Sequence, residues 1–159
     1  MKNLEIMGTK LQGHLKIYNV DTGELLLDKY NAIHLPNMAT SIANSLNNSS
    51  AELTTFRMGD GTGTPDMTTS SAVLLNEVYS TPITGTFVIT DTSTAAITSR
   101  QLQLTVTLAY GDANGTSGLT ELGLFDATGA KITHITFSPI TKDSTASLQF
   151  VYDIGIAVS

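Results

Sequence analysis

Two stretches of the chain alternate between large apolar side chains and polar or small ones. From 101 to 110 the even positions hold Leu, Val or Tyr, and from 148 to 158 they hold Leu, Phe, Tyr, Ile or Val. A period of two is that of a β-strand, whose successive side chains point to opposite faces. We therefore expect two long strands, each with one dry face, and we place Tyr110 and Tyr152 on those dry faces.

Shorter runs of the same kind are separated by turn residues. Residues 14–20 and 24–28 flank an Asp-Thr-Gly turn and predict a β-hairpin. The segment 72–79 is either extended or contains one helical turn. Further strands are predicted at 54–58, 86–90, 119–125 and 131–137. The glycines that we assign to structural turns are Gly23, Gly59, Gly61, Gly63, Gly115 and Gly129.

One segment, 35–46, has a different period. Pro36 suits a first helical turn, and Asn47 begins a polar run that ends the pattern. We expect one short amphipathic helix whose apolar face packs against the core of the sandwich, and a partner-binding helix is the alternative. The apolar residues at helical spacing are Leu35, Met38, Ala39, Ile42, Ala43 and Leu46.

Together these elements predict an all-β fold. We expect an antiparallel β-sandwich or jelly roll of about seven to eight strands with one short helix. A length of 159 residues suits one domain. We place this domain at residues 11–159, after an N-terminal arm of residues 1–10.

The low charge of the chain narrows its expected partners. Charged residues make up 14% of the sequence, against about 25% in ordinary domains, so Thr, Ser and Asn must supply the polar surface. A net charge of −6 and eight dispersed basic residues argue against direct binding of nucleic acid. The absence of cysteine excludes disulfides and thiolate metal sites.

Membranes are not expected partners either. No run of the sequence reaches the roughly 20 apolar residues of a membrane span. Glu5 interrupts the segment in which a signal peptide would need an apolar run. We therefore expect synthesis in a cytosol.

Residues with catalytic or metal-binding chemistry are sparse. His14, His34 and His134 match no metal-ligand spacing, and no Gly-x-Ser-x-Gly motif is present. We expect no catalytic site, no metal site and no cofactor. Glu121 stands out because its strand is otherwise strongly apolar, and it is either buried and hydrogen-bonded or directed to solvent.

The segment 59–66 is the richest in turn residues. It lacks the Lys-Ser/Thr pair that completes a phosphate-binding P-loop. Asp60 and Asp66 carry oxygens that calcium accepts, but the EF-hand spacing is absent, so the presence of a cation stays open. We expect a tight loop whose glycines adopt positive φ.

The C-terminal third contains a recognisable combination of motifs. Residues 121–129 are ELGLFDATG, residues 137–142 are FSPITK, and the alternating segment follows. This combination resembles small virion proteins of tailed bacteriophages, in which a Glu-x-Gly-Leu-Phe strand, a hairpin, a Lys turn and a terminal strand complete a β-sandwich. Residues 31–33 and 56–61 are similar to upstream elements of the same group, so the resemblance covers about residues 31–158.

The resemblance implies a non-enzymatic structural protein of the virion. It recurs in capsid decoration (cement) proteins and in neck, collar or tail-fibre attachment modules. Because no fibre shaft follows Ser159, we expect capsid decoration, with the major capsid protein as partner and homo-oligomeric or lattice-bound copies. The candidate partner contacts, in the arm and the glycine-rich loop, are Met1, Lys2, Asn3, Leu4, Asp60, Thr62 and Thr64.

Two other classes of protein remain as competitors. A carbohydrate-binding module would use the same sandwich but display aromatic rings, and here tryptophan is absent and aromatics are 6%. A glycoside hydrolase would need a second carboxylate in a cleft with Glu121.

Overall fold

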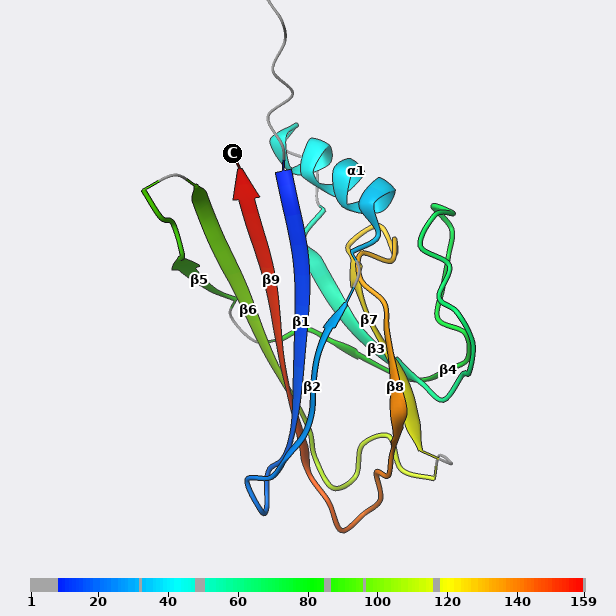
Figure 1. Cartoon of the computed structure of the whole chain (residues 1–159). Coiled ribbons are helices and arrows are strands. Elements are labelled where there is room, and N and C mark those ends of the chain that lie inside the picture. The colour runs from blue at the N-terminus through cyan, green and yellow to red at the C-terminus, as the bar shows by residue number, and fades with distance from the viewer. Residues whose placement is uncertain are drawn as a thin grey trace, which may run out of the picture.

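The alternating segments form the strands of two antiparallel sheets that pack face to face in the computed structural model (Figure 1). The structure describes residues 9–31, 33–47, 51–84, 87–95, 97–115 and 118–158. The elements in these residues are β1 (Thr9–Asn19), β2 (Leu25–Asn31), α1 (Leu35–Leu46), β3 (Leu53–Gly59), β4 (Glu77–Pro82), β5 (Val88–Asp91), β6 (Thr98–Leu108), β7 (Leu119–Asp126), β8 (Ile135–Ile140) and β9 (Leu148–Val158). The predicted all-β sandwich is confirmed, with nine strands in the described residues.

The sheets differ in size and in how they are assembled. The five-stranded sheet has the order β2-β1-β9-β6-β5, and the four-stranded sheet has the order β4-β3-β7-β8. The last strand, β9, pairs along its whole length with both β1 and β6. Thr9 is therefore opposite Val158, and contacts between the two ends of the described chain form the middle of this sheet.

The core lies between the two sheets and is built from the alternating apolar positions. Phe56 of β3 and Phe150 of β9 meet edge to face across it, with 5.2 Å between ring centroids. Tyr152 is buried in the same layer, as predicted. Tyr110 was predicted to share a dry face, and this is wrong. It follows the end of β6 in a turn, where it is 50% exposed.

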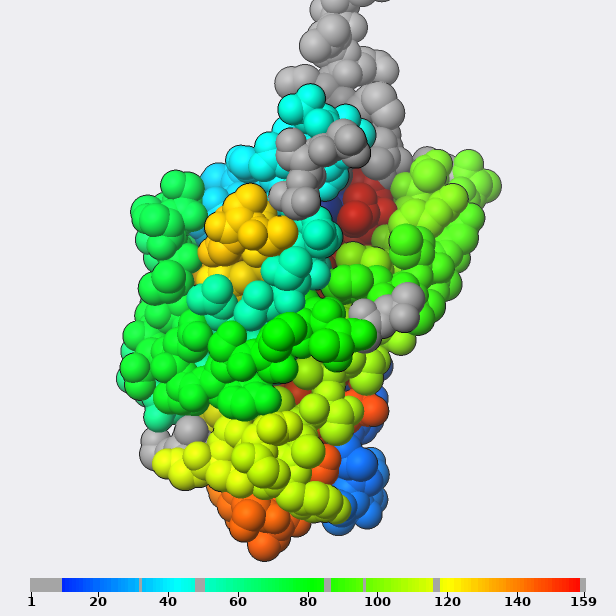
Figure 2. Space-filling view, turned by 180° about the vertical axis from the view of Figure 1, so that it is seen from behind, coloured from blue at the N-terminus to red at the C-terminus, as the bar shows by residue number. Residues whose placement is uncertain are grey.

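Strand β7 does not alternate, because all eight of its residues are buried. One face, including Leu122 and Leu124, joins the core between the sheets. The loop 60–76 covers the opposite face, where Leu74 packs close to Gly123 and Phe125. In Figure 2 this loop and β4, both green, lie along the edge and across the middle of the four-stranded face.

Helix α1 spans the predicted residues and crosses one end of the sandwich (Figure 1). His34 caps it, since its Nδ1 accepts a hydrogen bond from the backbone N–H of Asn37 at 3.3 Å. Pro36 lies in the first turn, where its missing N–H leaves no bond unmade. None of the helices in the described residues has the length and apolarity needed to cross a membrane.

Several predicted boundaries shift. Strand β1 begins at Thr9, so the last two residues of the predicted arm belong to the first strand. Strand β8 begins at Ile135, four residues later than predicted, and the segment 72–76 belongs to the loop before β4. Gly59 was assigned to a turn, but it is the last residue of β3. Positive φ angles, as turns require, are found at Gly23, Gly63, Gly115 and Gly129.

Candidate functional site

The first candidate site is the loop 60–76, which hydrogen-bonds to β7 through the Glu121 carboxylate and the Thr120 hydroxyl. Glu121 is fully buried and accepts hydrogen bonds from three backbone N–H groups of the loop. The donors are Gly61 at 3.3 Å, Leu75 at 2.9 Å and Asn76 at 2.7 Å. The prediction that Glu121 is buried and hydrogen-bonded is therefore confirmed, and the alternative of a solvent-facing side chain is wrong.

Two further buried side chains extend this attachment. The Nζ of Lys131 donates to the carbonyls of Asp66 at 2.6 Å and Val73 at 3.1 Å. It also lies 3.1 Å from Nδ1 of His134, whose Nε2 is 2.7 Å from Glu121 Oε2. Since the ammonium has only donors, Nδ1 must accept, and the imidazole proton lies on Nε2. This Lys131–His134–Glu121 chain uses all three ammonium N–H groups.

Opposing effects act on the pKa of Glu121 and on that of Lys131. Burial raises the pKa of Glu121, but hydrogen bonds from His134, Asn76 and Leu75 together hold this pKa below its ordinary value of 4.5. Burial also lowers the pKa of Lys131 against the attraction of Asp66 and Glu121. A carboxyl group with a lowered pKa stabilises the fold above its unfolded-state pKa. That contribution is lost as the pH falls through the lower, folded-state value.

Gly59, at the end of β3, and Gly61, in the loop, leave room for the Glu121 carboxylate and for the close approach of the loop backbone. Of Gly59, Gly61 and Gly63, only Gly63 has a positive φ, so the expectation for the other two is wrong. A Cβ on Gly59 would lie 2.2 Å from Glu121 Oε1, and one on Gly61 would lie 2.4 Å from the Cβ of Leu75. These two glycines are needed because the loop backbone must approach β7 closely.

The hydrogen-bonded series Lys131–His134–Glu121 holds the loop 60–76 against β7. All three side chains are buried, so no substrate reaches them in this structure. Asp60 and Asp66 each accept a hydrogen bond from within the loop, Asp60 from the Asn76 amide at 2.5 Å and Asp66 from the Thr68 backbone N–H at 2.9 Å. In the part of the chain that the structure describes, no three acidic or histidine side chains are grouped as metal ligands.

The remaining predicted contact residues are only partly placed. Thr62 and Thr64 are exposed on the loop and line two neighbouring hollows beside β8. Met1, Lys2, Asn3 and Leu4 lie outside the described residues. The role of these six residues and of Asp60 as partner contacts stays a prediction.

Lys142, in the turn that carries the resemblance, is a second buried lysine. Its Nζ donates to Asn114 Oδ1 at 2.9 Å, to the carbonyl of Asp143 at 2.9 Å and to that of Tyr110 at 3.4 Å. The lysine thus ties the loop after β6 to the loop before β9. Like the Glu121 carboxylate, the Lys142 ammonium group forms its hydrogen bonds within the protein.

The second candidate site is helix α1, which packs on the protein through a mostly polar face and not through the predicted apolar face. Its buried residues are Asn37, Met38 and Ser41. Asn37 donates to the carbonyl of Lys131 at 2.9 Å, and Ser41 donates to Asp126 Oδ2 at 2.5 Å. Polar side chains therefore make the specific bonds that hold the helix to the sandwich.

The apolar face of α1 lies to one side of the buried face and is largely exposed. Leu35 is 62% exposed, Ile42 40% and Leu46 85%. At 100° per residue, the centre of this face lies roughly a third of a turn from the buried face. The prediction that the apolar face packs on the core is wrong, apart from Met38. We call Leu35, Ala39, Ile42 and Leu46 the helix stripe.

An apolar groove borders the helix stripe. It has a volume of about 270 Å³ and runs between α1 and the ends of both sheets. Ile42 and Leu46 form one wall, and Leu102 and Ile156 contribute from the five-stranded sheet. Stripe and groove together form a continuous apolar surface, which is the usual mark of a protein contact on a soluble domain.

The comparisons with known proteins assign no function to this arrangement. Models of protein families, curated proteins and solved structures all give no match. Function must therefore be argued from the residues themselves.

We predict that Glu121→Ala lowers the free energy of unfolding by about 3–5 kcal/mol, because His134 and three backbone N–H groups lose their buried acceptor. Glu77→Ala is the control, since Glu77 forms a surface pair with Arg57 at 3.2 Å and such pairs contribute about 1 kcal/mol or less. Urea unfolding at pH 7 measures both. The gap between wild type and Glu121→Ala should narrow as the pH falls below 4.5. Equal losses in the two variants would show that Glu121 is not an anchor.

A glycine pair tests the close approach of the loop. Gly61→Ala should cost about 1–3 kcal/mol, the range for overpacking a filled site, because its Cβ would meet Leu75 and Glu121. Gly111→Ala has no neighbour within 4 Å and no positive φ, so it should be neutral or slightly stabilising. Thermal unfolding of both variants decides, and a neutral Gly61→Ala would contradict the proposed contact.

Proposed function

We propose that the protein is a non-enzymatic structural protein of a tailed-phage particle and binds other virion proteins through the helix stripe. The observation that carries the proposal is the outward apolar face of α1, with Leu46 85% exposed. The motifs at 121–129 and 137–142 add the resemblance to small virion proteins. The preferred partner is the major capsid protein, which makes the chain a capsid decoration (cement) protein.

The energetics favour contact through this surface. Each large apolar side chain fully covered by a partner gains about 1.5–3 kcal/mol relative to its exposed state. The fold keeps α1 in place through Asn37 and Ser41, so the stripe is not needed to hold the helix. A stripe that is not used for folding is available to a partner with an apolar surface.

The low charge of the chain as a whole supports the same function. With 14% charged residues, an interface covers few ionised groups and avoids their large desolvation cost. Copies arranged on a symmetric lattice, or as a homo-oligomer, would add many weak contacts into strong overall attachment. Neither nucleic acid nor a membrane is part of the proposal.

The buried chemistry favours a structural role over catalysis. Glu121 and His134 pair at 2.7 Å with no exposed side-chain surface. Their remaining acceptors and donors bind the loop and Lys131. A general acid or base must reach the proton that it transfers, and these groups are enclosed by the loop that they anchor.

A neck, collar or tail-fibre attachment protein is the second candidate. The same resemblance recurs in these modules, and the helix stripe would serve such an adaptor equally well. The two candidates differ in the surface of the particle that the stripe covers.

We expect the purified protein to bind particles prepared without it, and Leu35→Ser with Leu46→Ser to abolish this binding. Both side chains are exposed, so the double variant should change folding stability by no more than about 0.5 kcal/mol per site. The control is Ile89→Ser, which removes an apolar side chain that is 70% exposed on β5. Cosedimentation with particles, followed by electron microscopy, measures the effect.

The images also separate the two candidates. Added density on the capsid faces supports decoration, and density at a vertex or on the tail supports the adaptor. If wild type binds neither, the proposed function is wrong. If the double variant binds as wild type does, the stripe is not the contact.

The arm offers a second contact with a neighbouring subunit. Residues 1–8 are the part of the predicted arm that precedes β1, and they include the candidate contacts Met1, Lys2, Asn3 and Leu4. Deletion of residues 1–8 leaves β1 whole and should lower particle occupancy without changing the melting temperature. Substitution of the same eight residues by a Gly/Ser sequence serves as the length-matched control. Unchanged occupancy after deletion would exclude the arm.

A further inference from the structure

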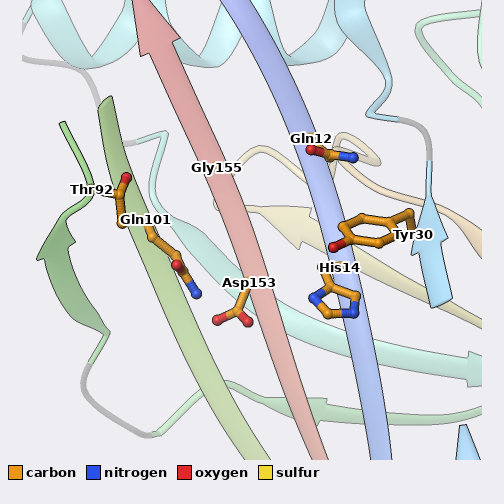
Figure 3. A pocket seen from close by; sticks show the side chains of 7 residues that line it. All are labelled: Gln12, His14, Tyr30, Thr92, Gln101, Asp153 and Gly155. Carbon is orange, nitrogen blue, oxygen red and sulfur yellow. The ribbon is translucent and has the colours of Figure 1, made fainter. Parts of the chain in front are cut away.

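The outer face of the five-stranded sheet carries a polar groove of about 210 Å³ (Figure 3). Its floor is one row of paired residues, in which Gln12 of β1 and Gln101 of β6 both lie opposite Gly155 of β9. Two amide side chains therefore flank a position that has no side chain. Neither of the contact surfaces proposed above includes this groove.

Gly155 is not explained by the needs of folding. Its backbone lacks a positive φ, and a Cβ there would meet nothing nearer than the Gln12 carbonyl oxygen, at 3.7 Å. That is an ordinary van der Waals distance, so a larger residue could occupy the position. What the glycine does provide is an open floor between Gln12 and Gln101.

The next row of the sheet holds polar groups in fixed orientations. Asp153 accepts a hydrogen bond from Gln103 Nε2 at 2.8 Å. The His14 Nε2 lies 2.5 Å from Asp28 Oδ1, and its ring stacks on Tyr30 with 4.2 Å between centroids. Such bonds prepare a site before a ligand arrives and reduce the entropy lost on binding.

Tyr30 adds an aromatic surface at the side of the groove. The residue is 60% exposed although one face of its ring is stacked on His14. Figure 3 shows the Tyr30 ring beside Gln12 and above His14, on the side of the groove opposite Gln101. An exposed ring next to polar groups can pack against a ligand that is apolar on one face and polar at its edges.

The groove continues into a second hollow of about 280 Å³ that shares Gln12, Thr92 and Gly155. The site is therefore elongated and suits a chain more than a compact molecule. Lys10 and Arg100 line the second hollow, and Arg100 is paired with Asp91 at 2.8 Å. Asp153 lines the first hollow and disfavours an anionic ligand there.

We propose that this groove binds a neutral oligosaccharide. Each glutamine amide both donates and accepts hydrogen bonds, and Asp153 accepts them, which matches hydroxyl groups that do both. The Tyr30 ring matches the C–H face of a sugar ring. A glycan on a bacterial surface and a free polysaccharide share this chemistry. The site goes beyond the proposed role in the particle and does not depend on it.

The test uses linear hexasaccharides of glucose, galactose, mannose and N-acetylglucosamine as probes. Binding to the full chain is measured by calorimetry, together with NMR shifts of the side-chain amides of Gln12 and Gln101. Gly155→Leu fills the floor and should weaken binding at least about tenfold, or 1.4 kcal/mol. Thr105→Leu is the matched control, because Thr105 lies on the same face of β6 outside both hollows. Gln12→Ala, at an exposed position, removes one amide without filling the groove.

The outcomes separate ligand class, location and folding. Binding of a neutral hexasaccharide that Gly155→Leu and Gln12→Ala weaken, and Thr105→Leu leaves unchanged, supports the site. Equal binding by Gly155→Leu and Thr105→Leu overturns its location. No binding of any hexasaccharide at about 10 mM overturns the proposal, as does binding of sulfated versions alone. Attachment of Gly155→Leu to particles should be unchanged, so failure here is distinct from failure of the proposed function.

Discussion

The buried carboxylate of Glu121 is the interaction on which the four-stranded half of the sandwich depends. A charged group without solvent must find partners within the protein, and Glu121 finds them in three loop amides and His134. The loop must come close enough to supply those amides, which in turn requires glycine at 59 and 61. Once the loop is in place, β7 has a second covered face, on which Leu74 of the loop packs close to Gly123 and Phe125.

Alternation predicted the sheets well because it reflects a local rule. In β6 and β9, each apolar side chain on one face faces the core, and the long strands and their dry faces follow directly. β7 does not follow this rule, because its outer face is covered by a polar, glycine-rich loop. No local sequence pattern in β7 predicts that a distant loop will cover it. For the same reason the sequence left Glu121 with two alternatives and gave no sign that Lys131 would join it.

Helix α1 shows a different limit of periodicity. The spacing predicted its bounds and grouped its apolar residues correctly, but periodicity does not tell which face of a helix meets the protein. That choice was made by partners distant in sequence, the Lys131 carbonyl for Asn37 and Asp126 for Ser41. The polar pair at positions 37 and 41, four residues apart on one side of the helix, was the available signal. Such a pair marks a polar attachment only when its acceptors are known.

The motifs that carry the resemblance account for the architecture of the protein, but they do not determine which partner it binds. Glu121 anchors a loop and Lys142 joins two others, so a protein would need these residues whatever its surface binds. Specificity must then reside outside the motifs, where substitution does not disturb the fold. The helix stripe and the outer groove meet that condition. They lie on separate elements, so a variant that alters one leaves the other intact, and each can be related to a binding partner on its own.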